Sequence, residues 1–315
     1  MRSVKPVRPT KWEYFVGALC DDVDLECASD RQFWEKNPPE EAQLWRALWS
    51  AANATHYFHQ STPHPPFEPS SAVPDVVRSV LENCDSTVWW DTPIDRVDQR
   101  IVEWLEDDPT PLGQGGLSEA LSEWTLRASQ EGGDGPWWSA PLGPSVIRTS
   151  RSTPFAPAVH LVADEDDMGR NRARIHVASP IPSDARIYEI SSASDWVALV
   201  DSAPLDVSIS RDENWGERAP IYQPFPLPAL RSKRPATTWW LPNWAKLASE
   251  YDGIHLTTWA YLDLSGIPIP ARTGNTMIAG WSPDETVWLN QMPAKIASTF
   301  DIARLDDATW TPNPM

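Results

Sequence analysis

Apolar residues recur at helical spacing through the first 60 residues of the chain. Trp12, Phe15 and Leu19 are separated by three or four positions, and the same period runs through residues 40–57. Such spacing predicts amphipathic helices whose apolar stripes face a common core. We therefore expect residues 1–133 to form a mostly helical N-terminal domain.

The glycine cluster Glu131–Gly135 separates this region from a stretch with a different pattern. Beyond it, short apolar runs predict β-strands, and alternation of polar with apolar residues is typical of antiparallel sheet. Helices are expected there only at Ala193–Asp201 and Asn243–Tyr251. The chain is thus predicted to be an α+β protein in which residues 136–315 form a mostly antiparallel sheet domain with a possible nucleotide-binding site. The strand-like runs beyond the glycine cluster are Ala158–Val162, Arg174–Val177, Arg186–Ile190 and Gly253–Trp259. One further strand-like run, Ser86–Trp90, lies in the first half of the chain.

Tryptophan, proline and acidic residues are unusually abundant. The 315 residues include 19 Trp and 32 Pro, and the formal net charge is −18. The Trp side chains are expected mainly to pack the core, because each can bury a large area. A negative charge of this size repels phosphates and anionic membrane surfaces. We therefore expect no nucleic-acid partner and no membrane association, whereas a protein partner with a basic surface would be attracted.

The cysteines and the N-terminus bear on localisation. Cys20, Cys27 and Cys84 are odd in number and form no Cys-x-x-Cys pair, which argues against a disulfide framework and a zinc site. The first residues are basic but lack the apolar segment of a signal peptide, and no apolar run is long enough to span a membrane. These features predict a cytoplasmic protein without structural metal.

Common catalytic motifs are absent from the sequence. It contains no phosphate-binding loop, dinucleotide fingerprint, nucleophile elbow or zinc-protease motif. His56, His59 and His64 lie close together, but a metal site needs a further ligand at a fixed distance. A surface or helix-capping role is expected for these histidines instead.

Residues 137–151, WWSAPLGPSVIRTSR, combine an aromatic pair with a hydroxyl and two arginines. Trp137 and Trp138 would stack on a flat ring, and Ser139 would bond a ribose. Arg148 or Arg151 would bind phosphate through two parallel hydrogen bonds. The alternative interpretation is a strand and a turn with arginines on the surface.

Two residues near the C-terminus are candidates for catalysis. His255 lies in a strand-like run, where it is either a catalytic group or a core histidine with satisfied hydrogen bonds. Glu285 follows Asp284, and the pair leads directly into an apolar strand. A carboxylate at that position would stabilise a developing cation. The alternative is a turn built on Ser-Pro-Asp.

Two resemblances accompany these observations. The segments PNWAKLASEYDGIHLTTWAYL, AGWSPDETVWLN, RQFWEKNPPEEAQLW and VWWDTPIDRVDQRIVEW resemble a family of uncharacterised actinobacterial proteins, which implies no function. The order of WWSAP, the ARIHV and ARIYEI strands, and a late acidic residue is similar to that in ADP-ribosyltransferases. This second resemblance implies that Ser139 holds the ribose of NAD and that Glu285 stabilises the ribose cation. The E-x-E pair of those enzymes is missing, because Asp284 directly precedes Glu285.

Two functional hypotheses follow from the sequence. The first is an NAD-dependent ADP-ribosyltransferase or NAD glycohydrolase, with NAD as co-substrate. The second is a non-enzymatic, acidic binding or immunity-type protein that recognises a protein partner. The enzyme hypothesis requires one pocket containing the catalytic candidates Glu285 and His255 and the cofactor-binding candidates Trp137, Trp138, Ser139, Arg148 and Arg151.

Overall fold

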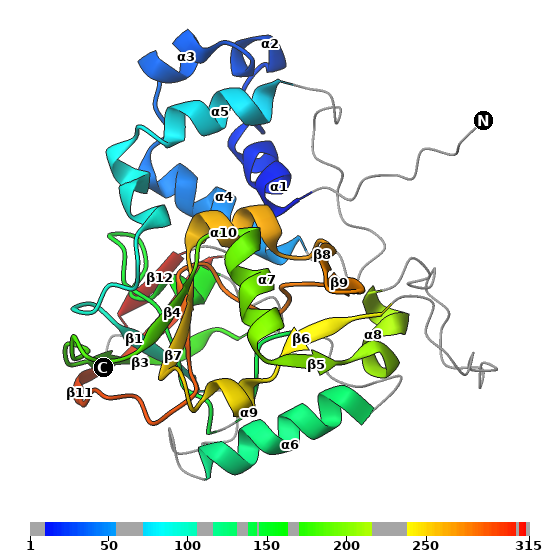
Figure 1. Ribbon diagram of the computed structural model, residues 1–315. Coiled ribbons are helices and arrows are strands. Elements are labelled where there is room, and N and C mark those ends of the chain that lie inside the picture. Colours follow the sequence, from blue (N-terminus) through cyan, green and yellow to red (C-terminus); the bar gives the residue numbers. More distant parts are fainter. Residues whose placement is uncertain are drawn as a thin grey trace, which may run out of the picture.

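The protein is an α+β structure with a helical N-terminal region and mostly antiparallel sheets, which confirms the predicted fold class. Figure 1 shows the N-terminal helices gathered at one end of the molecule and the strands at the other. The computed structural model describes residues 10–54, 72–105, 116–130, 138–143, 145–162, 170–215, 238–306 and 309–312.

Short helices with polar caps make up the N-terminal region. The Thr10 hydroxyl accepts a hydrogen bond from the Glu13 backbone amide, and the Glu13 carboxylate accepts one from the Thr10 amide, which forms a capping box. Asp24 and Asp30 cap the next two helices in a simpler way. The helices are α1 (Lys11–Leu19), α2 (Leu25–Ala28), α3 (Arg31–Lys36), α4 (Glu41–Asn53) and α5 (Val73–Leu81).

Two four-stranded sheets form the rest of the framework. The first sheet has the order β1-β3-β11-β12 and is antiparallel throughout. The second has the order β2-β10-β7-β4, and only its β4–β7 pair is parallel. The strands of the first sheet are β1 (Arg100–Trp104), β3 (Arg172–Ala178), β11 (Ile296–Asp306) and β12 (Thr309–Pro312). Those of the second are β2 (Arg148–Thr149), β4 (Ile187–Ile190), β7 (Gly253–Leu256) and β10 (Glu285–Trp288).

Helices and two small hairpins surround these sheets. The pairs β5–β6 and β8–β9 are both antiparallel, and α6 packs on α8 and α9. The remaining helices are η1 (Asp85–Asp91), α6 (Leu117–Gln130), η2 (Val159–Val162), α7 (Ala193–Ser202), α8 (Ser208–Trp215), α9 (Trp244–Leu247) and α10 (Thr258–Leu264), where η denotes a 3₁₀ helix. The remaining strands are β5 (Pro204–Asp206), β6 (Trp240–Pro242), β8 (Ile269–Ala271) and β9 (Gly274–Thr276).

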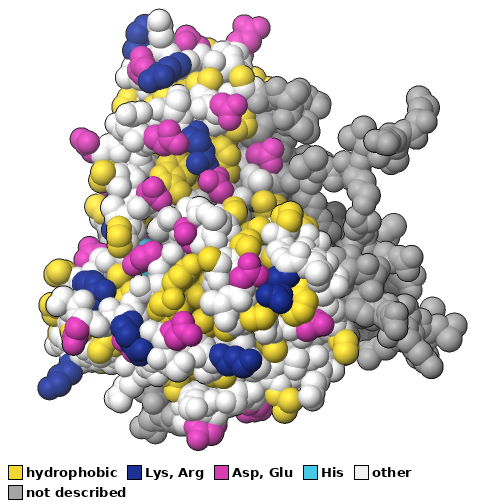
Figure 2. Space-filling model, in the orientation of Figure 1, with side chains coloured by type: hydrophobic (Ala, Val, Ile, Leu, Met, Phe, Trp, Pro, Cys, Tyr) yellow, Lys and Arg dark blue, Asp and Glu magenta, His cyan; other side chains and the backbone are white. Residues whose placement is uncertain are grey.

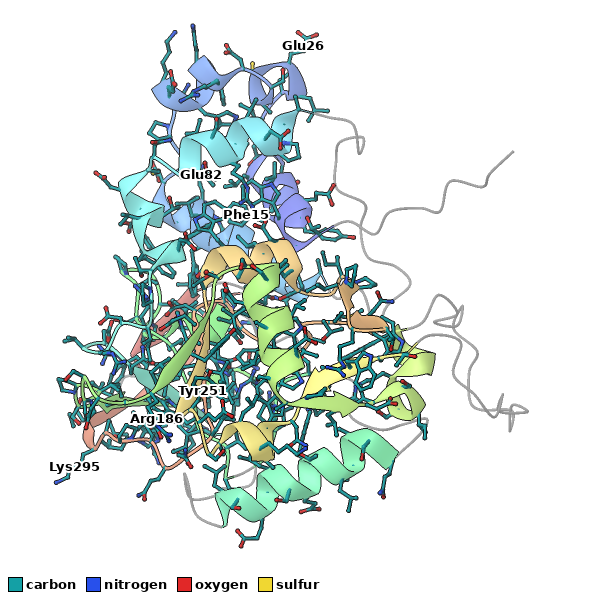
Figure 3. All side chains as sticks on the ribbon, viewed as in Figure 1. Phe15, Glu26, Glu82, Arg186, Tyr251 and Lys295 are labelled. Atoms are coloured by element: carbon teal, nitrogen blue, oxygen red, sulfur yellow. The ribbon has the colours of Figure 1, made fainter. Side chains whose placement is uncertain are left out.

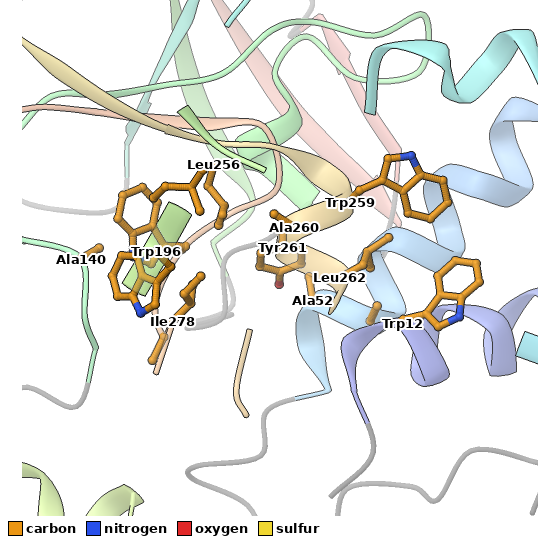
Figure 4. Close-up of a cluster of buried hydrophobic side chains, with 14 of the residues drawn as sticks. Trp12, Ala52, Ala140, Trp196, Leu256, Trp259, Ala260, Tyr261, Leu262 and Ile278 are labelled. Carbon is orange, nitrogen blue, oxygen red and sulfur yellow. The ribbon is translucent and has the colours of Figure 1, made fainter. Parts of the chain in front are cut away.

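One apolar core joins the N-terminal helices to the second sheet. Trp259 of α10 packs edge-to-face on Trp12 of α1, with ring centroids 5.5 Å apart. Tyr261 of the same helix is fully buried, and Figure 4 shows α10 between Trp12 on one side and Trp196 on the other. Figure 3 shows side chains packed among the N-terminal helices, where Phe15 lies, and around the sheets.

The domain boundary predicted near residue 133 would divide both this core and the first sheet. Strand β1 precedes the boundary in sequence, yet it pairs along its whole length with β3. The division into 1–133 and 136–315 remains a prediction, but the two parts share packing surfaces that separate domains would not need.

Two strand predictions are wrong in the structure, and a third is confirmed only in part. Ser86–Trp90 lies in the 3₁₀ helix η1, and Val159–Val162 of the second predicted run forms η2. Gly253–Leu256 is strand β7, but the end of the run predicted over Gly253–Trp259 begins α10. In that last segment, the Thr257 hydroxyl accepts the Ala260 amide and starts the helix. Apolar runs of four or five residues do not distinguish a buried strand from a short buried helix.

The acidic residues are scattered over the face of the molecule shown in Figure 2. On the face shown in Figure 2, Asp and Glu side chains are interspersed with Lys, Arg and hydrophobic groups. Within the part of the chain that the structure describes, no helix is both long and apolar enough to cross a membrane.

Candidate functional site

Neighbouring strands of the second sheet bring Arg148 and Glu285 together. Arg148 pairs in register with Val287, two residues beyond Glu285, so both side chains lie on one face of the sheet. Arg148 Nη2 is 2.5 Å from Glu285 Oε2 and 2.6 Å from the carbonyl oxygen of Gly280. The carboxylate of Glu285 is fully buried, and the Arg148 guanidinium compensates its charge.

His160 and Ser282 complete this group, which we call the Glu285 cluster: Arg148, His160, Ser282 and Glu285. His160 Nδ1 is 3.0 Å from Glu285 Oε1 and 3.1 Å from the hydroxyl of Ser282. A Ser-His-acid relay needs the hydroxyl and the acid on opposite ring nitrogens. Here both lie at the same nitrogen, so the cluster is not arranged as a serine nucleophile with its base.

Several donors keep Glu285 ionised. Burial acts to raise its pKa, but the charge of Arg148 and the close approach of His160 outweigh burial and lower it. The Ser282 amide also donates to Oε2, at 3.0 Å. Glu285 is therefore suited to an electrostatic role as an anion and not to donating a proton.

A second charged group, which we call the Asp284 cluster, consists of Arg151, Glu189, His255 and Asp284. Asp284 Oδ1 lies 2.8 Å from Arg151 Nε, and Oδ2 accepts the Arg151 amide at 3.0 Å. The backbone of Asp284 has φ of 54°, a left-handed conformation that non-glycine residues adopt rarely. This turn directs the adjacent carboxylates of Asp284 and Glu285 to different partners.

His255 is held as a cation between two carboxylates. Its Nδ1 is 2.5 Å from Glu189 Oε2 and its Nε2 is 3.4 Å from Asp284 Oδ1, so both nitrogens carry a proton to donate. Burial acts to lower the pKa of His255, but the hydrogen bonds to Asp284 and Glu189 outweigh it and raise the pKa to about 9. The same contact with His255 lowers the pKa of Asp284 against the effect of burial.

The register of the sheet separates the two catalytic candidates. His255 pairs with Thr286, whereas Glu285 pairs with Leu256. Because side chains alternate along a strand, His255 and Glu285 belong to opposite faces. The expectation that both act in one pocket is therefore corrected: His255 lies in the Asp284 cluster with both ring nitrogens engaged, and we assign it a structural role.

Ser139 is also a structural residue. Its hydroxyl donates to the Ala279 carbonyl at 3.1 Å and accepts the Ala279 amide at 2.9 Å and Trp281 Nε1 at 3.1 Å. A hydroxyl has one hydrogen to donate and two lone pairs to accept, so none of its bonding capacity is left for a ribose. The ribose-binding role expected of Ser139 is replaced by one of holding the 279–281 segment.

Trp138 and Arg151, two other cofactor-binding candidates, both lie against neighbouring parts of the fold. Trp138 packs against Gly280, next to the carbonyl that Arg148 contacts, while Trp137 lies outside the described residues. Arg151 forms a salt bridge with Asp284, and its Cζ lies 4.9 Å from the centroid of the Trp89 ring. Of the candidate set, Arg148 and Glu285 are in direct contact, and the Arg148 side chain is partly exposed to solvent.

Access to the Glu285 cluster is through Arg148 and His160. The side chains of Arg148 and His160 are 19% and 15% exposed, while Glu285 is 0% exposed. A ligand that reaches Glu285 must therefore first displace Arg148 or His160.

The sequence interpretation misses His160 and Glu189. The apolar run around His160 predicts a strand, although the residue belongs to η2. Glu189 faces His255 directly across the parallel β4–β7 pair. The alternating pattern of ARIYEI places Glu189 on one face of a strand, but only the strand order shows that a histidine lies opposite.

The described residues contain no group of three His, Cys, Asp or Glu side chains placed to hold a metal ion. Cys20, Cys27 and Cys84 are free thiols. The histidines at 56, 59 and 64 lie outside the described residues. Comparisons with protein-family models, curated proteins and solved structures found no match to this chain.

Proposed function

We propose that the protein cleaves the nicotinamide–ribose bond of NAD, as an NAD glycohydrolase or an ADP-ribosyltransferase, at the Glu285 cluster. The observation that supports this proposal is the contact between Arg148 and Glu285 on adjacent strands, with His160 beside them. An arginine suits the anionic pyrophosphate of NAD, and an ionised carboxylate beside it suits the positive charge that develops on the ribose.

The match concerns the charges that NAD carries and develops. Its pyrophosphate is anionic and suits the planar guanidinium of Arg148. Its ribose becomes cationic as nicotinamide departs, and the low-dielectric surroundings of Glu285 strengthen attraction to that cation. Substrate binding would thus exchange one ion pair for two, with Arg148 turning to the pyrophosphate and Glu285 to the ribose.

The bond changes balance without a further reagent. The C1′–N bond breaks, and its electron pair leaves with neutral nicotinamide. An oxygen nucleophile, either water or an acceptor hydroxyl, forms the new bond to C1′ and releases one proton. His160 lies next to Glu285 and is partly exposed, so it is placed to accept that proton.

Release of nicotinamide from NAD by the purified chain tests the proposal. Glu285→Gln keeps the shape of the side chain but removes the charge, and we expect turnover to fall on the order of a hundredfold or more. Because the neutral amide would leave the largely buried Arg148 without its counterion, the double variant Glu285→Gln, Arg148→Gln provides a charge-balanced form that should fold and remain inactive.

Asp252→Asn is the matched control, because Asp252 also pairs with an arginine, Arg186, but lies outside both clusters. It should release nicotinamide at the wild-type rate. If the folded wild-type chain neither binds NAD in calorimetry nor releases nicotinamide, the proposal is wrong.

An apolar groove favours a second candidate function, recognition of a protein partner. The groove contains about 380 Å³ of space, part of it open to solvent, and is lined by α4, η1 and residues 153–155. Phe155 is 41% exposed and Val88 of η1 is 72% exposed. Trp89 lines the groove and also contacts Arg151. Exposed apolar groups around an aromatic-lined groove are typical of binding surfaces.

Selection of displayed peptides on the immobilised chain tests this second function. Given the charge of −18, we expect basic peptides with an apolar anchor that bind the wild type and lose affinity for Phe155→Glu. Leu126→Glu is the control, because Leu126 is similarly exposed on α6, away from the residues that line the groove. Selected peptides that bind both variants equally well would rule out the groove as their site.

A further inference from the structure

Arg211 of α8 is a fully buried cation with neutral partners. Its side chain exposes no surface. Nη1 donates to the Ser210 hydroxyl at 2.9 Å, and Nη2 donates to the carbonyl oxygen of Trp138 at 3.0 Å. Nε is buried and has no acceptor among the described residues. The guanidinium is thus desolvated while part of its donor capacity is unused, a costly arrangement for a charged group.

Aromatic rings with unused donors surround this guanidinium. Its central carbon lies 5.2 Å from the centroid of the Trp215 ring, and that ring packs edge-to-face on Trp239 at 5.4 Å. Trp215 Nε1 and Trp239 Nε1 are both buried, and neither has an acceptor in the described part of the chain. Buried donors normally have partners, so three such donors in one packed group indicate a missing acceptor.

Other arginines of the chain show what Arg211 lacks. Arg78, Arg151 and Arg272 also stack on Trp rings, at 4.6, 4.9 and 5.0 Å. Each of the three pairs with a carboxylate, from Asp263, Asp284 and Asp201 respectively. Arg211 has the ring but no carboxylate partner among the described residues. Burial alone lowers the pKa of Arg211 to about 9, which a counterion would oppose.

We propose that Arg211 binds an oxyanion, a phosphate or a carboxylate group, beside the Trp215–Trp239 pair. The Nε side of a guanidinium forms two parallel hydrogen bonds with such a group, and the indole N–H groups are further donors for it. The bound anion supplies the negative charge that Asp residues give to Arg78, Arg151 and Arg272. The site is separate from the Glu285 cluster and does not depend on the function proposed there.

Thermal unfolding of the full chain in phosphate and in acetate, at constant ionic strength, tests this site. One of the two anions should raise Tm saturably, by about 4 °C at a hundredfold excess over its Kd. A rise in phosphate alone identifies a phosphate site, and a rise in acetate alone identifies a carboxylate site. Arg211→Met should abolish the response.

Arg272→Met is the matched control, because it removes an arginine that stacks on Trp240 and already has a carboxylate partner. Its response should equal that of the wild type. Should Arg211→Met fail to fold, Arg211→Lys retains the charge but loses the planar fork, and its Kd should rise at least about tenfold. The absence of a saturable rise in the wild type, or an equal rise in the Arg211 variant, would overturn the proposal.

Discussion

At the scale of single residues, the most distinctive feature is the alternation of charge across the end of the second sheet. Each of its four strands contributes one charged side chain: Arg148, Glu285, His255 and Glu189, in spatial order. Every one of these groups has a partner of opposite charge. Breaking one pair would leave a buried charge, which is far more damaging than losing an exposed salt bridge.

The pH dependence of stability reports on His255. Its pKa is raised from an ordinary value of 6.5 to about 9 in the folded protein. The stabilisation that protonated His255 contributes to the folded state is therefore fully present below about pH 6.5, and it is lost as the pH rises through 9. We expect the free energy of unfolding to fall by roughly 3 kcal/mol across this interval, measured by urea titration.

His255→Gln should remove that slope, whereas His176→Gln should retain it. His176 lies in the first sheet, where it contacts Glu103 and Thr299 outside both clusters. A wild-type stability that stays level between pH 6.5 and 9 would contradict the cationic state of His255.

The sequence shows which residues have side chains suited to a site, but it does not show which other residues they contact. Arg148 and Glu285 are separate candidates in the sequence and meet in the structure. The hydroxyl of Ser139 suggests a ribose contact, but Ala279 and Trp281 use that hydroxyl fully. Such long-range partners cannot be inferred from local pattern.

At the scale of elements, Gly280 determines how closely two segments approach beside the Glu285 cluster. Gly280 has φ of 71°, and a Cβ added there would lie 2.3 Å from Cβ of Trp138. Its carbonyl oxygen is also a partner of Arg148. The close contact between residue 138 and residue 280 therefore helps to position the arginine.

Gly280→Ala should destabilise the protein by at least about 1 kcal/mol, because both the positive φ and the contact with Trp138 oppose a side chain. Chemical denaturation measures this loss. Gly143 also has a positive φ, of 156°, but a Cβ added there meets no atom within 4 Å, so Gly143→Ala should cause a smaller loss. If the two variants are equally stable, crowding against Trp138 is unimportant.

Element prediction from sequence succeeds where helices are long or strands alternate clearly. The helix expected over Ala193–Asp201 and the strands over Arg174–Val177 and Arg186–Ile190 are present. The two strands belong to different sheets, and β4 runs parallel to β7. Strand partners depend on tertiary packing, so alternation alone could not assign them.

At the scale of the whole molecule, the core is shared between regions that the sequence predicts to be separate. Helix α10 contacts α1 and η1, and β1 completes the sheet that contains β3. The glycine cluster at 131–135 marks a change of pattern, but such clusters also occur between parts of one folding unit.

Separate expression of residues 136–315 should therefore give an unfolded or aggregating fragment. It would lack β1, which leaves one edge of β3 exposed, and Trp12, which leaves Trp259 without its packing partner. Circular dichroism and cooperative thermal unfolding provide the measurement. A soluble fragment that unfolds cooperatively would instead support two domains divided near residue 133.

The central claim is that Arg148 and Glu285 form a site for NAD. A crystal structure of the chain with a non-hydrolysable NAD analogue, in which a carbon replaces the ribose ring oxygen, tests this most directly. We expect the pyrophosphate within hydrogen-bonding distance of Arg148 and the ribose-like ring beside Glu285, with the Arg148–Glu285 contact broken. A structure in which the analogue binds elsewhere, or is absent at saturating concentration while this ion pair stays closed, would contradict the claim.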